Sequence, residues 1–115
     1  MEDCIFCKIA NGEIKSEIIY ENDDFISFPD ANQKVKGHSL VVPKKHFETT
    51  LDLPSSLGTE LLDCLKKTTL KLMDKEKFEG FNIVNNNFES AGQIVKHTHY
   101  HILPRKKGGI VPYCY

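Results

Sequence analysis

The chain has 115 residues, of which 40% are hydrophobic and 27% are charged. This length predicts one domain, residues 1–115, with a single core. The formal net charge of -1 argues against nucleic-acid polymers and anionic membranes as partners. No basic segment followed by an apolar stretch opens the chain, and no apolar run reaches membrane-spanning length. We therefore expect a cytoplasmic protein with reduced cysteines.

The first half of the chain predicts one short helix and three strands. The helix covers residues 4–10 and ends at residues 11–12, Asn-Gly, because both residue types readily adopt the left-handed conformation. Residues 18–20 and 25–28 flank a polar turn and predict a β-hairpin. A third strand is predicted over residues 39–42.

The second half predicts one long helix and two more strands. Ser55 or Ser56 is expected to cap the helix. Its apolar residues recur at helical spacing and are interpreted as core packing: Leu57, Leu61, Cys64, Leu65, Leu72 and Met73. Residues 81–84 and 97–103 predict strands on either side of a loop over residues 85–92. An antiparallel sheet of about five strands with one long and one short helix is an α+β domain.

Three histidines alternate along the last predicted strand, HTHYHIL: His97, His99 and His101. Alternate residues of a strand share a face, so the three imidazoles are expected in a row, roughly 7 Å apart. A single histidine on a strand is more often structural. Three in alternation predict a chemical site, because histidine can act near neutral pH as nucleophile, proton donor or metal ligand.

The N-terminal Cys4-x-x-Cys7 is either a redox pair or half of a zinc site. A redox motif is expected to follow a strand, and only three residues precede Cys4, which favours zinc. A tetrahedral zinc site needs two further nitrogen or sulfur ligands. We interpret Cys64 and Cys114 as packing or free thiols.

Two long motifs, GHSLVVPKKH at residues 37–46 and AGQIVKHTHYHILPR at residues 91–105, resemble the histidine triad (HIT) family of nucleotide hydrolases and transferases. The resemblance extends through CIFCKIANGEI and FISFPDANQKVKGH, so it covers residues 4–105 and leaves a short tail, residues 106–115. It implies a single HIT-like domain. Within the family, the chain is most similar to small prokaryotic members of the purine-nucleoside phosphoramidase and dinucleotide-polyphosphate hydrolase type.

The resemblance implies an enzyme that cleaves a purine nucleotide derivative, with adenosine as the family's usual nucleoside, at the α-phosphate and releases the nucleoside monophosphate. His99 would attack the phosphorus to give a covalent nucleotidyl-histidine. His101 would stabilise the transition state or protonate the leaving group. The other implied catalytic residues are Gln93 and His38.

The resemblance also implies a nucleotide site with an apolar base pocket, a carboxylate for the ribose and polar groups around the phosphate. Its residues are Phe6, Ile9, Phe28, Asp30, Asn86, Gly92, Gln93, His99 and His101. The first three would line the base pocket, and Asp30 would accept hydrogen bonds from the ribose hydroxyls.

Family members that carry the CxxC motif add two histidines as metal ligands. The resemblance therefore implies one structural zinc per chain, held by Cys4, Cys7, His46 and His97. It also implies a homodimer with the long helix and a strand at the interface.

One position departs from the family pattern. Many relatives have serine or threonine after the glutamine, where this chain has Ile94, so we expect slower phosphoramidate cleavage. A nucleotide-binding sensor or adaptor with little turnover therefore stays an alternative. A hydrolase with a zinc-bound water is a second alternative, since His-x-His can bind a catalytic zinc. A uridylyltransferase agrees less well with the sequence, because Thr98 stands where those relatives carry proline. Those relatives also have two fused copies of the domain, whereas this chain has one.

Overall fold

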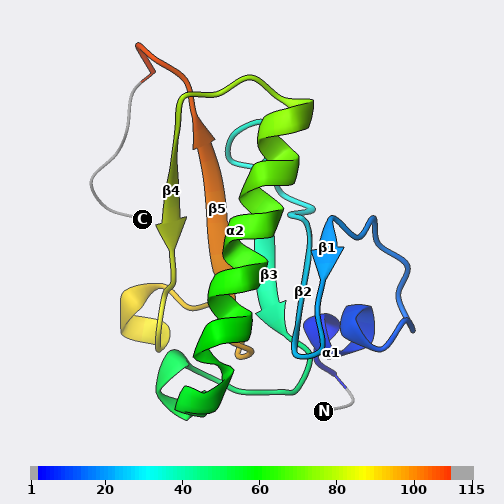
Figure 1. Cartoon of the computed structure of the whole chain (residues 1–115). Helices are drawn as coiled ribbons and strands as arrows, with labels where there is room; N and C mark the ends of the chain where they lie inside the picture. Colours follow the sequence, from blue (N-terminus) through cyan, green and yellow to red (C-terminus); the bar gives the residue numbers. More distant parts are fainter. Residues whose placement is uncertain (1–2, 110–115) are drawn as a thin grey trace.

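The computed structural model describes residues 3–109, so Cys114 and the rest of the tail beyond residue 109 lie outside the described residues. Figure 1 shows the chain. In order, its helices and strands are α1 (Ile5–Ala10), β1 (Tyr20–Glu21), β2 (Phe25–Pro29), β3 (Ser39–Pro43), α2 (Gly58–Lys75), β4 (Gly80–Val84) and β5 (Tyr100–Arg105).

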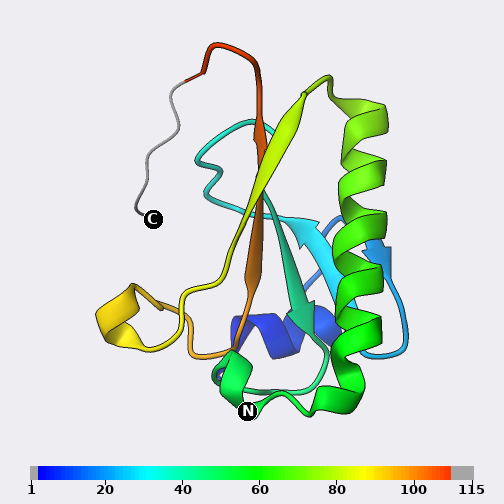
Figure 2. The same ribbon diagram turned by 60° about the vertical axis from the view of Figure 1, so that its left-hand side comes forward.

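The strands form one antiparallel sheet in the order β1-β2-β3-β5-β4. Helix α2 runs along one face of this sheet (Figure 1), and Figure 2 shows it standing to one side of the strands. The register places Leu40 of β3 and Val84 of β4 on either side of His101 in β5. The predicted α+β fold, with about five antiparallel strands, one long and one short helix, is confirmed.

Side chains of the central strands alternate between the two faces of the sheet, as the twofold period of a strand requires. On the face covered by α2, the core consists of Phe25, Val41, Cys64, Leu72, Phe78, Tyr100 and Ile102. On the other face, α1 covers a smaller core that consists of Phe6, Ile26, Phe28, Leu40 and Val42. The histidine of β5 lies on this second face, since His101 pairs with Leu40.

The predicted short elements are found with small changes. Asn11 is the C-cap of α1, and Gly12 follows with φ +85°, which confirms the predicted helix end. The first hairpin strand is shorter than predicted and covers only Tyr20–Glu21. The predicted loop over residues 85–92 contains a 3₁₀ turn, Glu89–Ala91.

The long helix begins differently from the prediction. Ser55 and Ser56 do not cap it; they form a 3₁₀ turn, Ser55–Leu57, and α2 starts at Gly58 without a side-chain cap. The prediction for Met73 is also wrong, because its side chain is 44% exposed. Met73 follows the buried Leu72, and one residue turns the helix by about 100°, which points Met73 away from the sheet.

The prediction that all three alternating histidines lie on one strand is wrong for the first two. β5 begins at Tyr100, so His97 and His99 precede it and only His101 belongs to it. Two contacts from elsewhere hold the backbone before β5. The Thr98 N–H donates to the carbonyl of Phe47 (2.7 Å), and the Asn85 amide donates to the carbonyl of His99 (2.9 Å).

Candidate active site and metal centre

Cys4, Cys7, His46 and His97 come together, with their possible ligand atoms all within 4.8 Å of one another. Cys4 is the N-cap of α1 and Cys7 lies in its first turn, so the helix presents both thiols on one side. The Sγ of Cys4 is 3.2 Å from Nδ1 of His97, and the Sγ of Cys7 is 3.4 Å from Nδ1 of His46. Two thiols and two imidazoles are the donor set of a closed, tetrahedral zinc site.

The hydrogen bond on the far side of the His97 ring suits metal binding. Its Nε2–H donates to the carbonyl of Pro43 over 2.8 Å, which leaves the Nδ1 lone pair facing the thiols. Burial lowers the pKa of His97 to about 4, so the ring is neutral at pH 7, as a ligand must be. Burial and the neighbouring Cys4 raise the pKa of Cys7 to about 11. A bound cation would therefore supply the charge that stabilises the thiolate.

His99 is buried and held in one tautomer. Its Nδ1–H donates to the carbonyl of His97 over 2.8 Å, and this hydrogen bond leaves Nε2 with a free lone pair. Burial lowers the pKa of His99, partly offset by the same hydrogen bond, so the ring is neutral at pH 7. An oriented, neutral imidazole with a free Nε2 is the form that can attack an electrophilic phosphorus.

His101 and His38 form a pair beside His99. The rings of His99 and His101 have centroids 5.0 Å apart, and His38 Nε2 lies 2.9 Å from His101 Nδ1. The Oδ2 of Asp30 is 3.3 Å from His38 Nε2. The sequence motifs therefore meet in space, because β2, β3 and β5 are adjacent in the sheet. The predicted role of Asp30 as ribose acceptor stays a prediction.

Phe6 connects the thiol cluster, His99 and the predicted base pocket. Its ring meets those of His97 and His99 edge-on, with centroid distances of 5.8 and 5.1 Å, and lies 5.8 Å from the ring of Phe28. Ile9 packs against the same apolar cluster. The three residues predicted for the base pocket are thus neighbours.

Gln93 is buried, and its amide is engaged by the main chain. Oε1 accepts from the N–H of Phe88 (2.8 Å), and Nε2 donates to the carbonyls of Glu48 and Val95. In this arrangement Gln93 holds the loop before the triad, and its predicted contact with phosphate stays a prediction. Gly92 has φ +92°, a conformation that favours glycine, and Ile94 is 89% exposed.

Sequence reasoning missed Asn85, the neighbour of the predicted Asn86. The Asn85 amide donates to the carbonyl of His99 (2.9 Å) and to the hydroxyl of Thr98 (3.1 Å). Its Oδ1 accepts from Asn87 and from Thr50. Asn85 thus holds the carbonyl of His99 and the side chain of Thr98, whereas the role of Asn86 stays a prediction. The only signal in the sequence was the polar run itself.

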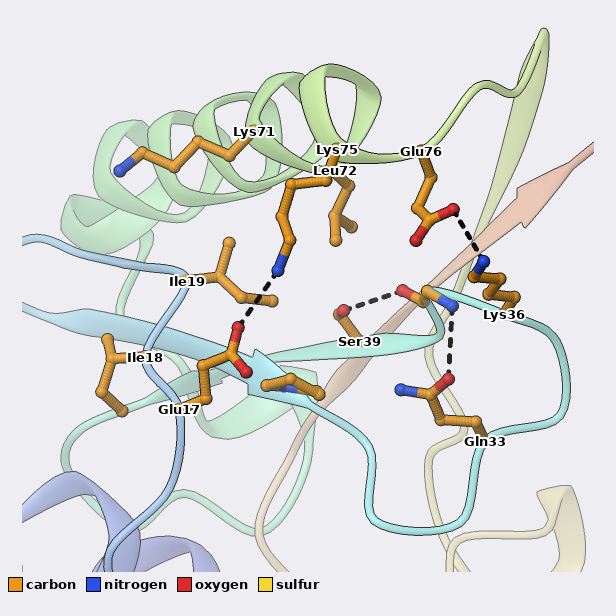
Figure 3. A pocket seen from close by; sticks show the side chains of 12 residues that line it. Glu17, Ile18, Ile19, Gln33, Lys36, Ser39, Lys71, Leu72, Lys75 and Glu76 are labelled. Atoms are coloured by element: carbon orange, nitrogen blue, oxygen red, sulfur yellow. Dashed lines mark hydrogen bonds and ion pairs between the residues drawn. The ribbon is translucent and has the colours of Figure 1, made fainter.

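A cavity of about 440 Å³ lies on the α2 side of the sheet (Figure 3). Two ion pairs cross it, Lys75 with Glu17 (3.3 Å) and Lys36 with Glu76 (3.4 Å). None of the residues predicted for catalysis, nucleotide or metal lines it. The predicted base-pocket residues and His101 lie on the opposite, α1-covered face.

Comparison with known proteins assigns the family. The model of the HIT domain matches residues 11–108. The chain belongs to the HIT domain family. The HIT-like protein MJ0866 of Methanocaldococcus jannaschii is 49% identical over 91% of this chain and 81% of its own length. The solved structure of SMU.412c from Streptococcus mutans UA159 matches with a TM-score of 0.90 and 39% identity, over 100% of this chain and 73% of that chain.

Two HIT relatives carry names that state an activity. Adenosine 5'-monophosphoramidase HNT1 of Candida albicans is 37% identical over 90% of this chain and 70% of its own length. Adenylylsulfatase HINT3 of Arabidopsis thaliana is 36% identical over 91% of this chain, which spans about half (53%) of that protein. Among the described residues of this HIT chain, no helix combines the length and apolarity needed to cross a bilayer.

Proposed function

We propose that this chain hydrolyses purine nucleotide derivatives, adenosine derivatives above all, at the α-phosphate and releases the nucleoside monophosphate through a nucleotidyl-histidine. The observation that carries the proposal is the hydrogen bond from His99 Nδ1–H to the His97 carbonyl, since it leaves Nε2 free as a nucleophile. The activities in the names of the Candida and Arabidopsis relatives support it.

In the first step, His99 Nε2 attacks the α-phosphorus and a P–N bond forms as the bond from phosphorus to the leaving group breaks. The neutral ring of His101, which lies next to that of His99, donates a hydrogen bond from Nε2–H to the leaving group and stabilises its developing negative charge, and the leaving group takes its proton from solvent. The Nδ1–H of His99 stays on the ring, and the His97 carbonyl stabilises the positive charge that develops there.

In the second step, water attacks the same phosphorus and the P–N bond breaks. One proton of the water passes to solvent, the oxygen and its other proton stay on the released monophosphate, and His99 regains its Nε2 lone pair. His101 thus donates a hydrogen bond in both steps. The low pKa of the buried His101, about 4, keeps its ring neutral at pH 7 throughout.

We also propose that Phe6, Ile9 and Phe28 hold the base and that Asp30 holds the ribose. The first three share one apolar cluster beside His99. Apolar walls with few polar groups are typical of nucleoside pockets.

For the thiol cluster, we propose one structural zinc per chain. Cys4, Cys7, His46 and His97 fit the ion by donor type and number, and the Pro43 carbonyl orients His97 toward it. Four protein ligands leave no open position for a water nucleophile, which argues against the metal-water alternative. Zinc would crosslink α1 to the chain before β5. Reduced cysteines are needed for it, which supports a location in the cytoplasm.

The test is AMP release from adenosine phosphoramidate and from diadenosine tetraphosphate, by the wild type and His99→Ala, with and without a chelator. We expect wild-type release that resists brief chelation and is lost in His99→Ala. Acid-free quenching followed by mass spectrometry should show an adenylyl group on the wild-type peptide that contains His99. Immediate loss of activity with chelator would instead favour the metal-water mechanism.

The sensor alternative remains because of Ile94, which lacks the hydroxyl found in many relatives. Tight binding of adenosine nucleotides without AMP release from either substrate would overturn the hydrolase proposal in its favour. Isothermal titration with AMP measures this binding directly.

We further propose a homodimer through an apolar strip on α2 and β4. The strip consists of the exposed residues Leu62, Leu70, Met73, Phe81 and Ile83. Within the described sheet, β4 is an edge strand that pairs only with β5, and unpaired edges with exposed apolar side chains invite pairing with another chain. Light scattering should give twice the chain mass for the wild type, and the chain mass for Leu70→Asp but not for Ile14→Asp on the α1–β1 loop. A monomeric wild type would contradict the dimer.

A further inference from the structure

His38 and His101 share a hydrogen bond whose direction is set by a third group. The Nδ1 of His38 lies 3.1 Å from the backbone nitrogen of Lys34. A backbone N–H can only donate, so Nδ1 must carry a lone pair. The proton of the neutral His38 ring is therefore on Nε2.

This proton determines the tautomer of the next ring. His38 Nε2–H points at His101 Nδ1, 2.9 Å away, with Asp30 Oδ2 as a second acceptor at 3.3 Å. His101 Nδ1 therefore accepts, and the proton of neutral His101 lies on Nε2. The hydrogen bonds run in one direction, from the Lys34 amide through His38 to His101.

We propose that the main-chain N–H of Lys34 locks the tautomers of His38 and His101 and thereby keeps this cluster free of metal. Under the proposed function, the same lock presents His101 Nε2–H to the leaving group. Lys34 is then a positioning residue that acts through its backbone, and its side chain is not needed for the lock.

The donor set of this cluster would suit a metal ion if the tautomers were free to change. Asp30, His38 and His101 offer three ligand atoms within 4.8 Å of one another, and one carboxylate with two imidazoles suits several transition metals. A metal at His38 Nε2 would need the lone pair that the Lys34 amide denies it. Moving the ring proton to Nδ1 would set two N–H groups against each other across 3.1 Å.

His97 shows the opposite arrangement. There a carbonyl, that of Pro43, accepts from Nε2–H and leaves Nδ1 free beside the two thiols. A carbonyl behind one ring thus prepares it for a metal, whereas an N–H behind the other prepares it to donate a hydrogen bond from Nε2. The two histidine clusters therefore differ in the backbone group that contacts the ring: a carbonyl at His97 and an N–H at His38.

Hydrogen bonds and an ion pair hold the loop that carries the Lys34 amide. Asp30 Oδ1 accepts from the N–H of Asn32 (2.8 Å), and Gln33 Oε1 accepts from that of Gly37 (3.3 Å). Figure 3 shows the Gln33 contact and the ion pair that links Lys36 to Glu76, next to α2. These contacts keep the Lys34 N–H pointed at His38.

The first test is nitrogen NMR of the full chain with labelled histidine. The wild type is expected to show His38 and His101 both protonated at Nε2 and unprotonated at Nδ1 near neutral pH. A His38 ring protonated at Nδ1 would overturn the proposal. This measurement needs no substrate and no variant, so it decides the lock even if AMP release fails.

The second test compares Lys34→Pro, which deletes the N–H, with Lys34→Ala, which removes only the side chain. Lys34→Ala should keep the wild-type tautomers. Lys34→Pro should show mixed tautomers, and kcat should fall at least about tenfold relative to Lys34→Ala with little change in KM. Identical tautomers in both folded variants would overturn the lock.

Cobalt titration of the metal-free chains tests the exclusion of metal. Lys34→Pro should bind one more Co²⁺ per chain than Lys34→Ala, and this extra ion should lack the thiolate charge-transfer band of a cysteine site. Equal numbers of bound Co²⁺ per chain in the two variants would overturn the proposal that the lock excludes metal. If neither the wild type nor Lys34→Ala releases AMP while the tautomers agree with the lock, the hydrolase proposal fails and the lock stands.

Discussion

The ring of Phe6 meets the ring of His99 edge-on, with centroids 5.1 Å apart. Phe6 lies on α1 between Cys4 and Cys7, so one short helix contacts both His99, the proposed nucleophile, and the proposed metal site. Aromatic pairs in this geometry contribute about 0.5–1.5 kcal/mol beyond burial. Phe6 therefore restrains the ring of His99 and also packs in the apolar core.

This contact predicts the effect of Phe6→Leu. Leucine fills much of the volume, so we expect the free energy of unfolding to fall by less than about 1.5 kcal/mol. Loss of the ring edge should lower kcat/KM for AMP release up to about tenfold. Phe78→Leu, in the core on the α2 face, is the control and should cost stability alone. Equal kcat/KM losses in both variants would contradict the role of Phe6.

Substitutions of Asn85 and Asn86 are expected to change different properties: stability and kcat for Asn85, KM for Asn86. Asn85→Ala removes the donor to the His99 carbonyl, so we expect about 1–3 kcal/mol of lost stability and a kcat lowered about tenfold. Asn86→Ala should raise KM without a change in stability. Urea unfolding and AMP release measure both effects, and a KM effect confined to Asn85→Ala would reverse the assignment.

The stability of the protein should fall in acid partly because of His101. Burial first, then the neighbouring His99 and His38, lower its pKa from the ordinary 6.5 to about 4. Between these values the unfolded chain binds a proton that the folded chain does not. The contribution of His101 to the free energy of unfolding is therefore complete above pH 6.5 and is lost as the pH falls toward 4. Urea midpoints across this range should change less in His101→Gln than in the wild type; equal slopes would exclude His101 as a source.

Two substitutions of Ile94 distinguish the effect of side-chain size on activity from the effect of the missing hydroxyl. Its side chain is 89% exposed, so its size does not cover His99. We expect Ile94→Ala to leave AMP release from adenosine phosphoramidate within about twofold. Ile94→Ser adds a hydroxyl and should raise kcat by roughly tenfold or more, the value of one hydrogen bond to a charged group. A large gain in Ile94→Ala would show that bulk was the obstacle.

Local patterns in the sequence predicted most of the fold. The strands that begin at Phe25 and Ser39 are short, largely apolar runs, and the helix that ends at Lys75 has apolar residues at helical spacing, so each segment carries its own signal. The errors at Ser55 and His97 have another origin. The backbone before β5 is held by Phe47 and Asn85, distant residues that no local period encodes, and Ser55 lies in a 3₁₀ turn that precedes α2.

For the candidate site, the motifs predicted which residues meet but not how their rings are oriented. His38 and His101 are 63 positions apart, and their pairing follows from the adjacency of β3 and β5. The tautomers depend on backbone groups of Lys34, Pro43 and His97. A main-chain N–H or carbonyl is the same in every residue type except proline, so sequence gives no signal for it.

Helix α1 has six residues, too few to be stable alone, so its order depends on what its side chains touch. If Cys4 and Cys7 hold a cation while Phe6 and Ile9 hold a base, each ligand orders the helix that the other requires. Thermodynamic linkage then makes the effect mutual: zinc raises the affinity for nucleotide by the same factor by which nucleotide raises the affinity for zinc.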